Sequence, residues 1–409
     1  MKTNNNIPAY RFQGYTDAWE LRKLGELTSY RNGKGYEDNQ SDFGKYELIN
    51  LNSISIEGGL KPSGKFINSA SETLNKNDLV MVLSDVGHGD LLGRVAIIPE
   101  DDRFVLNQRV ALLRNNDYAD CKYLFAYINA NQHYFKLQGA GSSQLNISKK
   151  AVENFVVHIP SQQEQSAIGT FFSTLDRHIT LHQRKLDTLK EQKKTYLKLL
   201  FPAKGQTKPA LRFRGFEDDW ELRKLGEIST HRGGTAIEKY FSEDGKYKVI
   251  SIGSYGLDNK YIDQKIRAVE NEVTRSKVVN KNELTMVLND KTANGNIIGR
   301  CLLIETDDEF VINQRTEIIS FNSVIYPKFA YVVLNGVFRE QVKKIVQGGT
   351  QIYVNYTSVE QLYLSLPSLP EQEAIGTFFQ TLDQEITQVE DKLASLKEMK
   401  KTLLRKLFV

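Results

Sequence analysis

The feature that most limits what this chain can fold into is an internal repeat with a period of about 200 residues. The segment PAYRFQGYTDAWELRKLGE begins at Pro8, and PALRFRGFEDDWELRKLGE begins at Pro209. Further along, EQSAIGTFFSTLD from Glu164 matches EQEAIGTFFQTLD from Glu371. The chain therefore consists of two homologous halves, and one fold has to serve both.

The two copies agree in framework segments and differ in particular loops. Residues 51–73 bear little likeness to residues 252–278, and residues 86–91 bear little likeness to residues 291–296. Because scaffolds carry packing and loops carry recognition, this difference favours one physical task performed on two different targets. Neutral drift after the duplication is the alternative.

Length and composition set further bounds. A chain of 409 residues predicts two domains of roughly 150 residues each, and 40% hydrophobic with 25% charged residues is typical of a soluble globular protein. A net charge of +4 permits nucleic-acid binding but also suits an ordinary, slightly basic enzyme. With no membrane span, no secretory signal, and only Cys121 and Cys301 available for a disulfide, we expect a reducing cytoplasm.

Each half alternates short apolar runs with one amphipathic helical stretch. The predicted strands lie at residues 79–83, 94–98, 155–160, 284–288, 301–304 and 362–367, and the predicted helices at residues 123–134 and 328–346. This mixture predicts an α+β fold in both domains, although the order of the strands stays open.

A long helix follows each globular part. Ser161 and Ser368 each stand three residues before a glutamate, Glu164 or Glu371, which predicts a capping box at both helix starts. Pro370 occupies a first-turn position, where a proline removes no intrahelical hydrogen bond.

Both helices carry a heptad seam. The first seam comprises Ile168, Phe172, Leu175, Ile179, His182, Leu186, Leu189, Lys193, Tyr196 and Leu200, and the second comprises Ile375, Phe379, Leu382, Ile386, Val389, Leu393, Leu396, Lys400, Leu403 and Leu407. Spacings that alternate between four and three over five heptads predict a coiled coil. Lys193 and Lys400 interrupt the seams, where they either set the register or extend to solvent.

The length of the helices indicates how they pair. From residue 164 to 201 the first helix would measure about 57 Å, far more than a globule of this size needs. The linker at residues 202–208 reaches at most about 25 Å, so an antiparallel pair within the chain is the simplest arrangement. It relates the halves by an approximate two-fold axis. Self-association between chains is the alternative.

Two homologous globules on a rod match the way in which dimeric DNA-binding proteins read two half-sites. Because the loops of the two copies differ, the target should be asymmetric and interrupted, with a gap fixed by the rod. A scaffold that only oligomerises through its helices gives no reason for the loops to diverge.

The order of two variable globules, each with a WELRKLGE opening and each followed by an EQxAIGTFF helix, closely resembles the specificity subunit of type I restriction-modification systems. The resemblance covers essentially the whole chain. It implies target-recognition domains at residues 1–160 and 209–366, a central spacer helix at residues 161–201, the linker at 202–208, and a C-terminal spacer helix at 367–409.

The resemblance also implies the partners. Double-stranded DNA is the ligand, and two methyltransferase subunits that use S-adenosylmethionine would methylate adenine after flipping it out of the stack. Restriction and translocase subunits would bring ATP and magnesium. An oligomerising DNA-binding protein or coiled-coil scaffold without a methyltransferase partner is the alternative.

The sequence lacks the motifs that catalysis in this chain would need. It contains no Asn-Pro-Pro-Tyr-like methyltransferase tetrapeptide, no GxxxxGK[ST] phosphate loop and no His/Cys spacing suited to zinc. We therefore expect no catalytic residues, cofactor or metal in this chain.

Polar loops hold the candidate DNA-reading residues, because Arg, Lys, Asn and Gln read base edges and hydroxyl groups hold phosphates. In the first domain these are Arg31, Lys34, Ser84, His88, Ser142, Ser143, Gln144 and Asn146. In the second domain they are Arg232, Asn289, Lys291, Asn294, Asn296, Thr350, Gln351, Tyr353 and Asn355. Solvated loop side chains are the alternative for each one.

Residues that are identical in both copies cannot distinguish two targets. Arg109 and Arg315, which end the two NQR triplets, are therefore expected to serve the framework or to hold phosphate. Trp19 and Trp220 are expected to pack at the entry of each domain.

Overall fold

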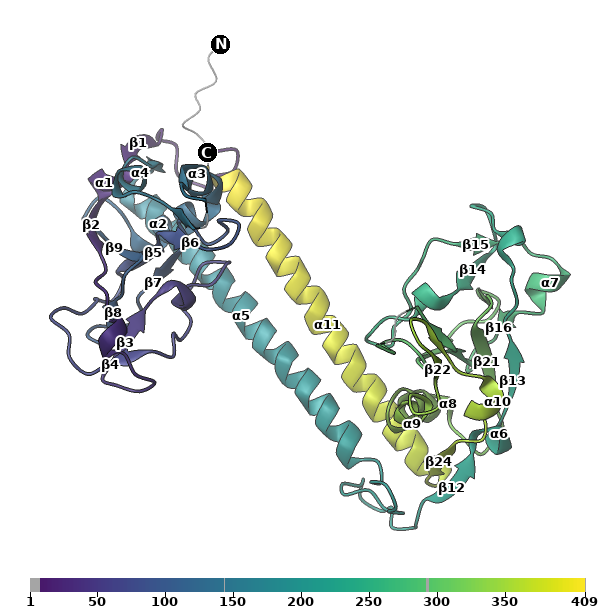
Figure 1. Cartoon of the computed structure of the whole chain (residues 1–409). Coiled ribbons are helices and arrows are strands. Elements are labelled where there is room, and N and C mark those ends of the chain that lie inside the picture. The colour runs from purple at the N-terminus through teal and green to yellow at the C-terminus, as the bar shows by residue number, and fades with distance from the viewer. Residues whose placement is uncertain (1–7, 143, 292–293, 409) are drawn as a thin grey trace. The chain divides into compact units, whose positions relative to one another are not determined.

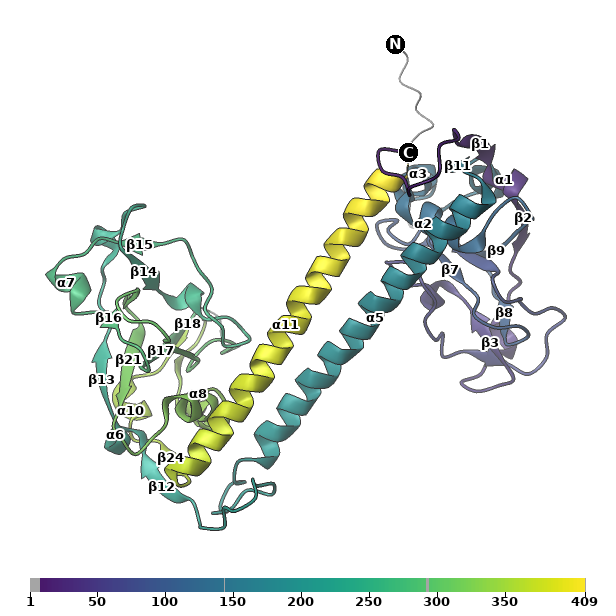
Figure 2. The same ribbon diagram turned by 180° about the vertical axis from the view of Figure 1, so that it is seen from behind.

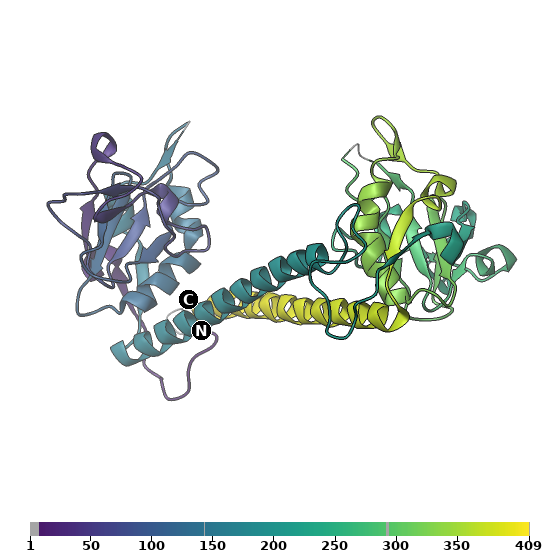
Figure 3. The ribbon, with the colours of Figure 1, turned by 90° about the horizontal axis from the view of Figure 1, so that it is seen from below.

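The computed structural model describes residues 8–142, 144–291 and 294–408. Two compact units emerge, one from residues 1–184 with 391–409 and one from residues 185–390. The helix α5 (Gln162–Leu199) begins in the first unit and ends in the second, whereas α11 (Leu369–Leu407) begins in the second and ends in the first. Figure 3 shows each of these helices as one uninterrupted ribbon.

The two repeats contain nearly the same series of elements (Figure 1). The first consists of β1 (Glu20–Lys23), α1 (Leu24–Leu27), β2 (Thr28–Asn32), η1 (Glu37–Asn39), β3 (Tyr46–Ile49), η2 (Leu51–Ser53), β4 (Phe66–Ile67), β5 (Leu79–Val82), β6 (Ser84–Asp85), β7 (Val95–Ile97), β8 (Phe104–Leu106), β9 (Val110–Asn115), α2 (Cys121–Ala130), α3 (Gln132–Gln138), β10 (Leu145–Asn146), α4 (Lys149–Glu153) and β11 (Val156–Ile159). The second consists of β12 (Glu221–Lys224), α6 (Leu225–Ile228), β13 (Ser229–Gly233), η3 (Glu238–Tyr240), β14 (Tyr247–Ile250), η4 (Ile252–Ser254), β15 (Arg267–Ala268), α7 (Glu272–Arg275), β16 (Val278–Val279), β17 (Leu284–Val287), β18 (Asn289–Asp290), β19 (Cys301–Leu303), β20 (Phe310–Ile312), β21 (Thr316–Phe321), α8 (Pro327–Asn335), α9 (Val337–Val342), β22 (Gln347–Gly348), β23 (Ile352–Tyr353), α10 (Tyr356–Val359) and β24 (Tyr363–Leu366).

The main sheet of each unit is antiparallel and has the same order, β2-β9-β5-β7 in the first unit and β13-β21-β17-β19 in the second. All four residues of β5 and of β17 are buried. In the first unit Leu79 and Met81 face one apolar cluster, and Val80 and Val82 face another. Burial on both faces explains why β5 reads as a continuous apolar run and β17 as a nearly continuous one. Each unit combines helices with mainly antiparallel sheets, which confirms the α+β prediction.

A smaller sheet differs between the copies. It has the order β4-β3-β8 in the first unit and β15-β14-β20-β16 in the second, with β3 parallel to β8 and β14 parallel to β20. The added strand β16 and the short helix α7 of the second unit (Figure 2) lie at residues 272–279, at the end of the dissimilar segment. The framework is thus shared, and the elaboration on it is not.

The single helices predicted at residues 123–134 and 328–346 are wrong in detail, because each is two helices. In the first unit the chain breaks at Asn131, whose side-chain amide donates to the Tyr127 carbonyl 2.8 Å away. In the second unit it breaks at Gly336, where φ is −99° and ψ is −119°, outside the helical region. Periodicity alone does not reveal a break that keeps the same apolar face buried.

The glutamate that opens each long helix serves a different purpose from the predicted capping box. Ser161 accepts from the Glu164 amide at 3.4 Å, but both Glu164 oxygens accept from the guanidinium of Arg11, each at 2.7 Å. Glu371 accepts from Arg212 in the same way, at 2.7 and 2.6 Å. Both carboxylates are inaccessible to solvent. Arg11 therefore holds the start of α5, and Arg212 holds the start of α11.

The glutamine and the glycine of the same motif contact a helix of the globule, α2 in the first unit and α8 in the second. The Gln165 side-chain oxygen accepts from the Asp120 amide at 2.9 Å, just before α2, and Gln372 accepts from the Tyr326 amide before α8. A β-carbon at Gly169 would lie 2.7 Å from the Tyr123 amide nitrogen, closer than a methyl group allows. The EQxAIG motif therefore positions the long helix against the globule.

Each core is completed by an aromatic residue that follows one of the long helices. Phe408, which follows α11, packs against Tyr123, Tyr127 and Phe172 with ring centroids 5.0–5.7 Å apart. In the second unit Phe201, which follows α5, packs against Trp220 at 5.9 Å. Trp220 is 4% exposed and Trp19 is 1% exposed, so the prediction that both tryptophans serve packing is confirmed.

The two lysines that interrupt the seams form ion pairs. In the second unit Lys193 lies 2.5 Å from Asp383, and in the first unit Lys400 lies 2.5 Å from Asp176. Lys397 also donates to Gln183 in the first unit, so contacts along α11 run in the opposite order to those along α5. Within this unit the helix segments are antiparallel, and both lysines form ion pairs instead of extending freely to solvent.

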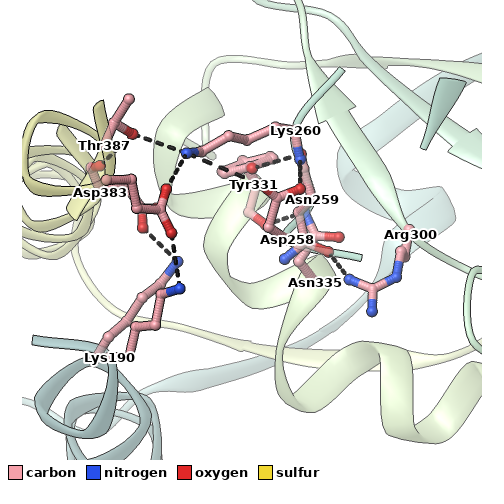
Figure 4. A network of polar contacts seen from close by, with 11 residues as sticks. Lys190, Asp258, Asn259, Lys260, Arg300, Tyr331, Asn335, Asp383 and Thr387 are labelled. Carbon is pink, nitrogen blue, oxygen red and sulfur yellow. Dashed lines mark hydrogen bonds and ion pairs between the residues drawn. The ribbon is translucent and has the colours of Figure 1, made fainter. Parts of the chain in front are cut away.

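The second globule is also tied to α11 by Lys260, as Figure 4 shows. Its ammonium group donates to the Thr387 hydroxyl at 2.9 Å and lies 3.4 Å from Glu390, which in turn pairs with Lys190 at 2.8 Å. The loop that carries Lys260 is held by Tyr331 of α8, whose hydroxyl donates to the Asn259 carbonyl at 2.9 Å. These contacts hold the globule and both helix segments of this unit together.

Cys121 and Cys301 are buried free thiols. In the part of the chain that the structure describes, no helix is both long enough and apolar enough to span a bilayer.

Candidate nucleic-acid interface

Two loops of the first domain that hold candidate residues meet in a short ladder. Strands β6 and β10 are antiparallel, with Ser84 opposite Asn146. Ser84 is 1% exposed. Its hydroxyl donates to the Asn146 side-chain oxygen at 2.6 Å and accepts from the Gln144 side-chain amide. These three candidates therefore form one hydrogen-bonded group at the base of the paired loops.

The tips of these loops are exposed. His88 and Ser142 are accessible to solvent, and Ser143 lies outside the described residues. The turn beyond β6 is shaped by Asp85, whose carboxylate accepts from the amides of Gly87 and Leu91 at 3.0 and 3.2 Å. A rigid base with an exposed tip suits a loop that binds another molecule.

The second domain repeats this arrangement with other residues. Asn289 of β18 lies opposite Tyr353 of β23, and Asp290 accepts from the Ile297 amide at 2.9 Å. The remaining candidates in these loops are all exposed: Lys291, Asn294, Asn296, Thr350, Gln351 and Asn355. Equivalent loops thus converge in both copies.

Arg31 and Arg232 do not join the paired loops. Arg31 forms an ion pair with Glu72, and Arg232 lies 2.8 Å from Glu283. Successive strand residues point to opposite faces, so Tyr30 and Asn32, not Arg31, face the paired loops. Lys34 is exposed beyond the end of β2.

A pocket of about 350 Å³ lies beside the paired loops of the first domain, between them and the end of β2. It is lined by Tyr30, Asn32, Gly33, Leu83, Ser84, Arg109, Asn146, Ile147 and Lys149. Only Ser84 and Asn146 were among the candidates. Strand alternation from Arg31 could have identified Tyr30 and Asn32, whereas nothing in the sequence placed Lys149 there.

Arg109 and Arg315 have an unusual backbone. Their φ angles are +66° and +67°, in the left-handed region that non-glycine residues seldom adopt. Both side chains are exposed, and neither forms a hydrogen bond or ion pair with another described residue. Backbone strain of this kind costs about 1–3 kcal/mol and persists where surrounding structure enforces it, often at binding sites.

Burial changes the acid–base properties of two groups near these positions. Desolvation raises the pKa of Tyr30 to about 12, and the negative charge of Glu153 adds to the effect. Desolvation also raises the pKa of Glu317, although the hydrogen bond from His231 opposes the shift. Glu317 lies opposite Gly233 in the main sheet, the place that Ala111 holds in the first domain.

Comparisons with known proteins place this geometry in a family. The model of the type I restriction modification DNA specificity domain matches residues 16–191 and again residues 217–398. The specificity subunit of the type I restriction enzyme MjaVIII of Methanocaldococcus jannaschii is 24% identical over 405 residues, which cover 94% of this chain and 91% of that protein. A putative MjaX specificity subunit of the same organism is 22% identical, with coverage of 94% and 92%.

Solved structures show the same fold. The crystal structure of a type I restriction-modification S subunit from M. genitalium superposes with a TM-score of 0.67 at 19% identity, covering 98% of this chain and 99% of that one. The repeated globules with their paired loops coincide with the two matches to the DNA specificity domain. The chain belongs to the family of type I restriction modification DNA specificity domains, of which it contains two copies.

Proposed function

We propose that this chain is the specificity subunit of a type I restriction-modification complex and that each domain reads one half of an asymmetric, bipartite DNA site. The observation that carries the proposal is that one framework presents two pairs of converging loops with different side chains. The proposed reading domains are residues 1–160 and 209–366. Side chains of the paired loops would contact the edges of the bases, and exposed lysine and arginine side chains near them would contact the phosphates.

The long helices would set the gap between the half-sites. Residues 161–201 and 367–409 are proposed to form an antiparallel coiled coil that relates the halves by an approximate two-fold axis, with residues 202–208 as the linker. The matching ion pairs Lys193–Asp383 and Lys400–Asp176 support this proposal, because an ion pair at a seam position fixes the register of two helices. A fixed register implies a fixed spacer length.

The partners follow from the proposed role. Two methyltransferase subunits would dock on the helices and methylate adenine with S-adenosylmethionine, and restriction subunits would use ATP and magnesium. The relatives named above are called specificity subunits, which supports a division of labour in which this chain supplies recognition. The complex would act on chromosomal DNA in the cytoplasm.

The test is to produce the chain with its modification subunits in a host that lacks DNA methylation and to map methyladenine across the genome. A single interrupted, asymmetric motif is the expected result. No motif, or an uninterrupted palindrome, would contradict the proposal. Methyl transfer by the purified chain with S-adenosylmethionine alone would contradict its recognition-only role, and failure to bind bipartite DNA would favour a scaffold.

A further inference from the structure

Residues that frame the pocket beside β6 and β10 of the first domain have counterparts in the second domain. Gly33 and Gly234 hold equivalent positions, and a β-carbon at either would lie within 2 Å of a backbone oxygen, 1.7 Å from Asn107 and 1.9 Å from Asn313. Arg109 and Arg315 share the same left-handed backbone, and their carbonyls accept from Leu83 and Leu288. The backbone around this position is therefore the same in both domains.

The side chains inside this frame differ in charge. In the first domain Lys149, the first residue of α4, lies 5.3 Å from the centre of the Tyr30 ring, and its ion pair with Glu153 is long, at 3.5 Å, and exposed. The Tyr30 hydroxyl donates to the Asn32 side-chain oxygen at 2.6 Å. The amide of Asn32 and the ammonium of Lys149 therefore remain as hydrogen-bond donors.

The second domain reverses this chemistry. Tyr356 replaces Lys149 at the start of α10, and His231 replaces Tyr30 and stacks on Tyr356 with ring centroids 4.4 Å apart. Gly233 replaces Asn32, and the space beside it is occupied by Glu317, whose carboxylate is 8% exposed. His231 binds one carboxylate oxygen at 2.6 Å, and the other oxygen has no donor among the described residues.

We propose that this pocket in the first domain receives a guanine edge, and that the equivalent position beside Glu317 in the second domain receives the amino group of adenine or cytosine. A donor-lined pocket fits guanine, which presents O6 and N7 as acceptors, whereas a carboxylate accepts from an exocyclic amine. Arg109 and Arg315, which are identical in the two domains, hold backbone phosphates beside the base. This inference rests on the proposed function of the chain.

The test uses the full complex with its modification subunits and compares the methylated motifs of variants. Lys149→Met removes the ammonium group and retains most of the side-chain length, and Lys150→Met, at the next position of α4 and outside the pocket lining, is its control. Glu317→Gln keeps the size of the side chain, and Glu243→Gln is its exposed control. We expect Lys149→Met to relax a guanine position in one half-site, and Glu317→Gln to relax an amine-bearing base in the other half-site only.

The size of the effect is set by the loss of one good base contact. Discrimination at the affected position should fall roughly tenfold or more, while the other half-site is unchanged. Arg109→Ala and Arg315→Ala should weaken binding to all sequences alike, and each should reduce the slope of log affinity against log salt by about one. The control variants should reproduce the wild-type motif.

A variant that gives no methylation is resolved by measuring its binding to duplexes changed at one half-site at a time. Loss confined to duplexes that alter the matching half-site supports the inference, and equal loss on all duplexes overturns it. An unchanged motif with Lys149→Met and Glu317→Gln also overturns it, but leaves the proposed function intact. If the wild-type complex yields no interrupted motif, the proposed function is wrong and this inference is wrong with it.

Discussion

The ammonium nitrogen of Lys193 lies 2.5 Å from the carboxylate of Asp383, and the equivalent residues Lys400 and Asp176 repeat this distance in the other unit. The side chains of the first pair are 24% and 30% exposed, so solvent screens them only in part. We expect a double-mutant cycle of Lys193→Ala and Asp383→Ala, followed by urea unfolding, to give a coupling energy of about 0.5–1 kcal/mol. The neighbouring exposed pair Lys194–Glu191 is the control, and an equal coupling energy there would argue against a register role.

Arg11→Ala should strongly destabilise the first unit, because it leaves the inaccessible Glu164 carboxylate without its guanidinium partner. Removing one member of a buried ion pair costs about 3–5 kcal/mol, which urea unfolding would detect. The control is Arg22→Ala, which removes the exposed pair with Glu20 and should change the free energy of unfolding by less than about 1 kcal/mol. Equal effects of the two variants would show that burial of Glu164 carries no penalty.

Gly169→Ala tests the contact between α5 and α2. In an open helix this change would stabilise by about 1 kcal/mol, because alanine has the higher helix propensity. Here the new methyl group would lie 2.7 Å from the Tyr123 amide nitrogen, so we expect a lower melting temperature. Thr174→Ala, at an exposed position of the same helix, should not lower it. A stabilised Gly169→Ala variant would mean that the two helices separate freely.

Phe408→Ala should open the first core, since the ring packs against Tyr123, Tyr127 and Phe172. Truncation of a buried phenylalanine costs about 3–5 kcal/mol, and chemical denaturation would measure it. Leu181→Ala, at a half-exposed position of α5, serves as the control and should cost much less. A loss no larger than that of the control would indicate that the residues after α11 do not contribute to the core.

His158 should make the first unit sensitive to acid. Burial lowers the pKa of His158 below its usual value of 6.5, and its Nδ1 lies 2.8 Å from the Tyr127 hydroxyl. The folded state then binds fewer protons than the unfolded chain, so stability is complete above pH 6.5 and falls as the pH drops through the folded-state pKa. His158→Gln should flatten this dependence in unfolding experiments from pH 7.5 to 5, whereas His133→Gln, at an exposed position, should not.

Local patterns in the sequence were sufficient to predict the long helices and the central strands. The heptad residues of α5 and α11 are buried or half-buried as the period requires, and β5 and β17 coincide with the predicted apolar runs. These features depend on neighbours within a few residues. The sequence also indicated where the copies diverge, at the ends of β6 and β18, but not that these loops pair with β10 and β23.

Features that depend on long-range contacts could not be predicted in this way. Glu164 matches a capping box by spacing, but Arg11, 153 residues away, competes for its carboxylate and forms the stronger bidentate contact. Arg31 was a candidate by residue type, and its ion pair with Glu72, 41 residues away, could not be predicted from the local sequence. Lys149 reaches the pocket only because α4 packs over Tyr30, which no local pattern encodes.

The place of Phe408 has a consequence for biosynthesis. The ribosome adds Phe408 285 residues after Tyr123, the aromatic ring against which it packs in the first core. At about 5–20 residues per second the nascent first domain waits roughly 15–60 s with that site open to water. Phe201, in contrast, is already made when Trp220 and the rest of the second core emerge. The half of the protein that is translated first is therefore the half that finishes folding last.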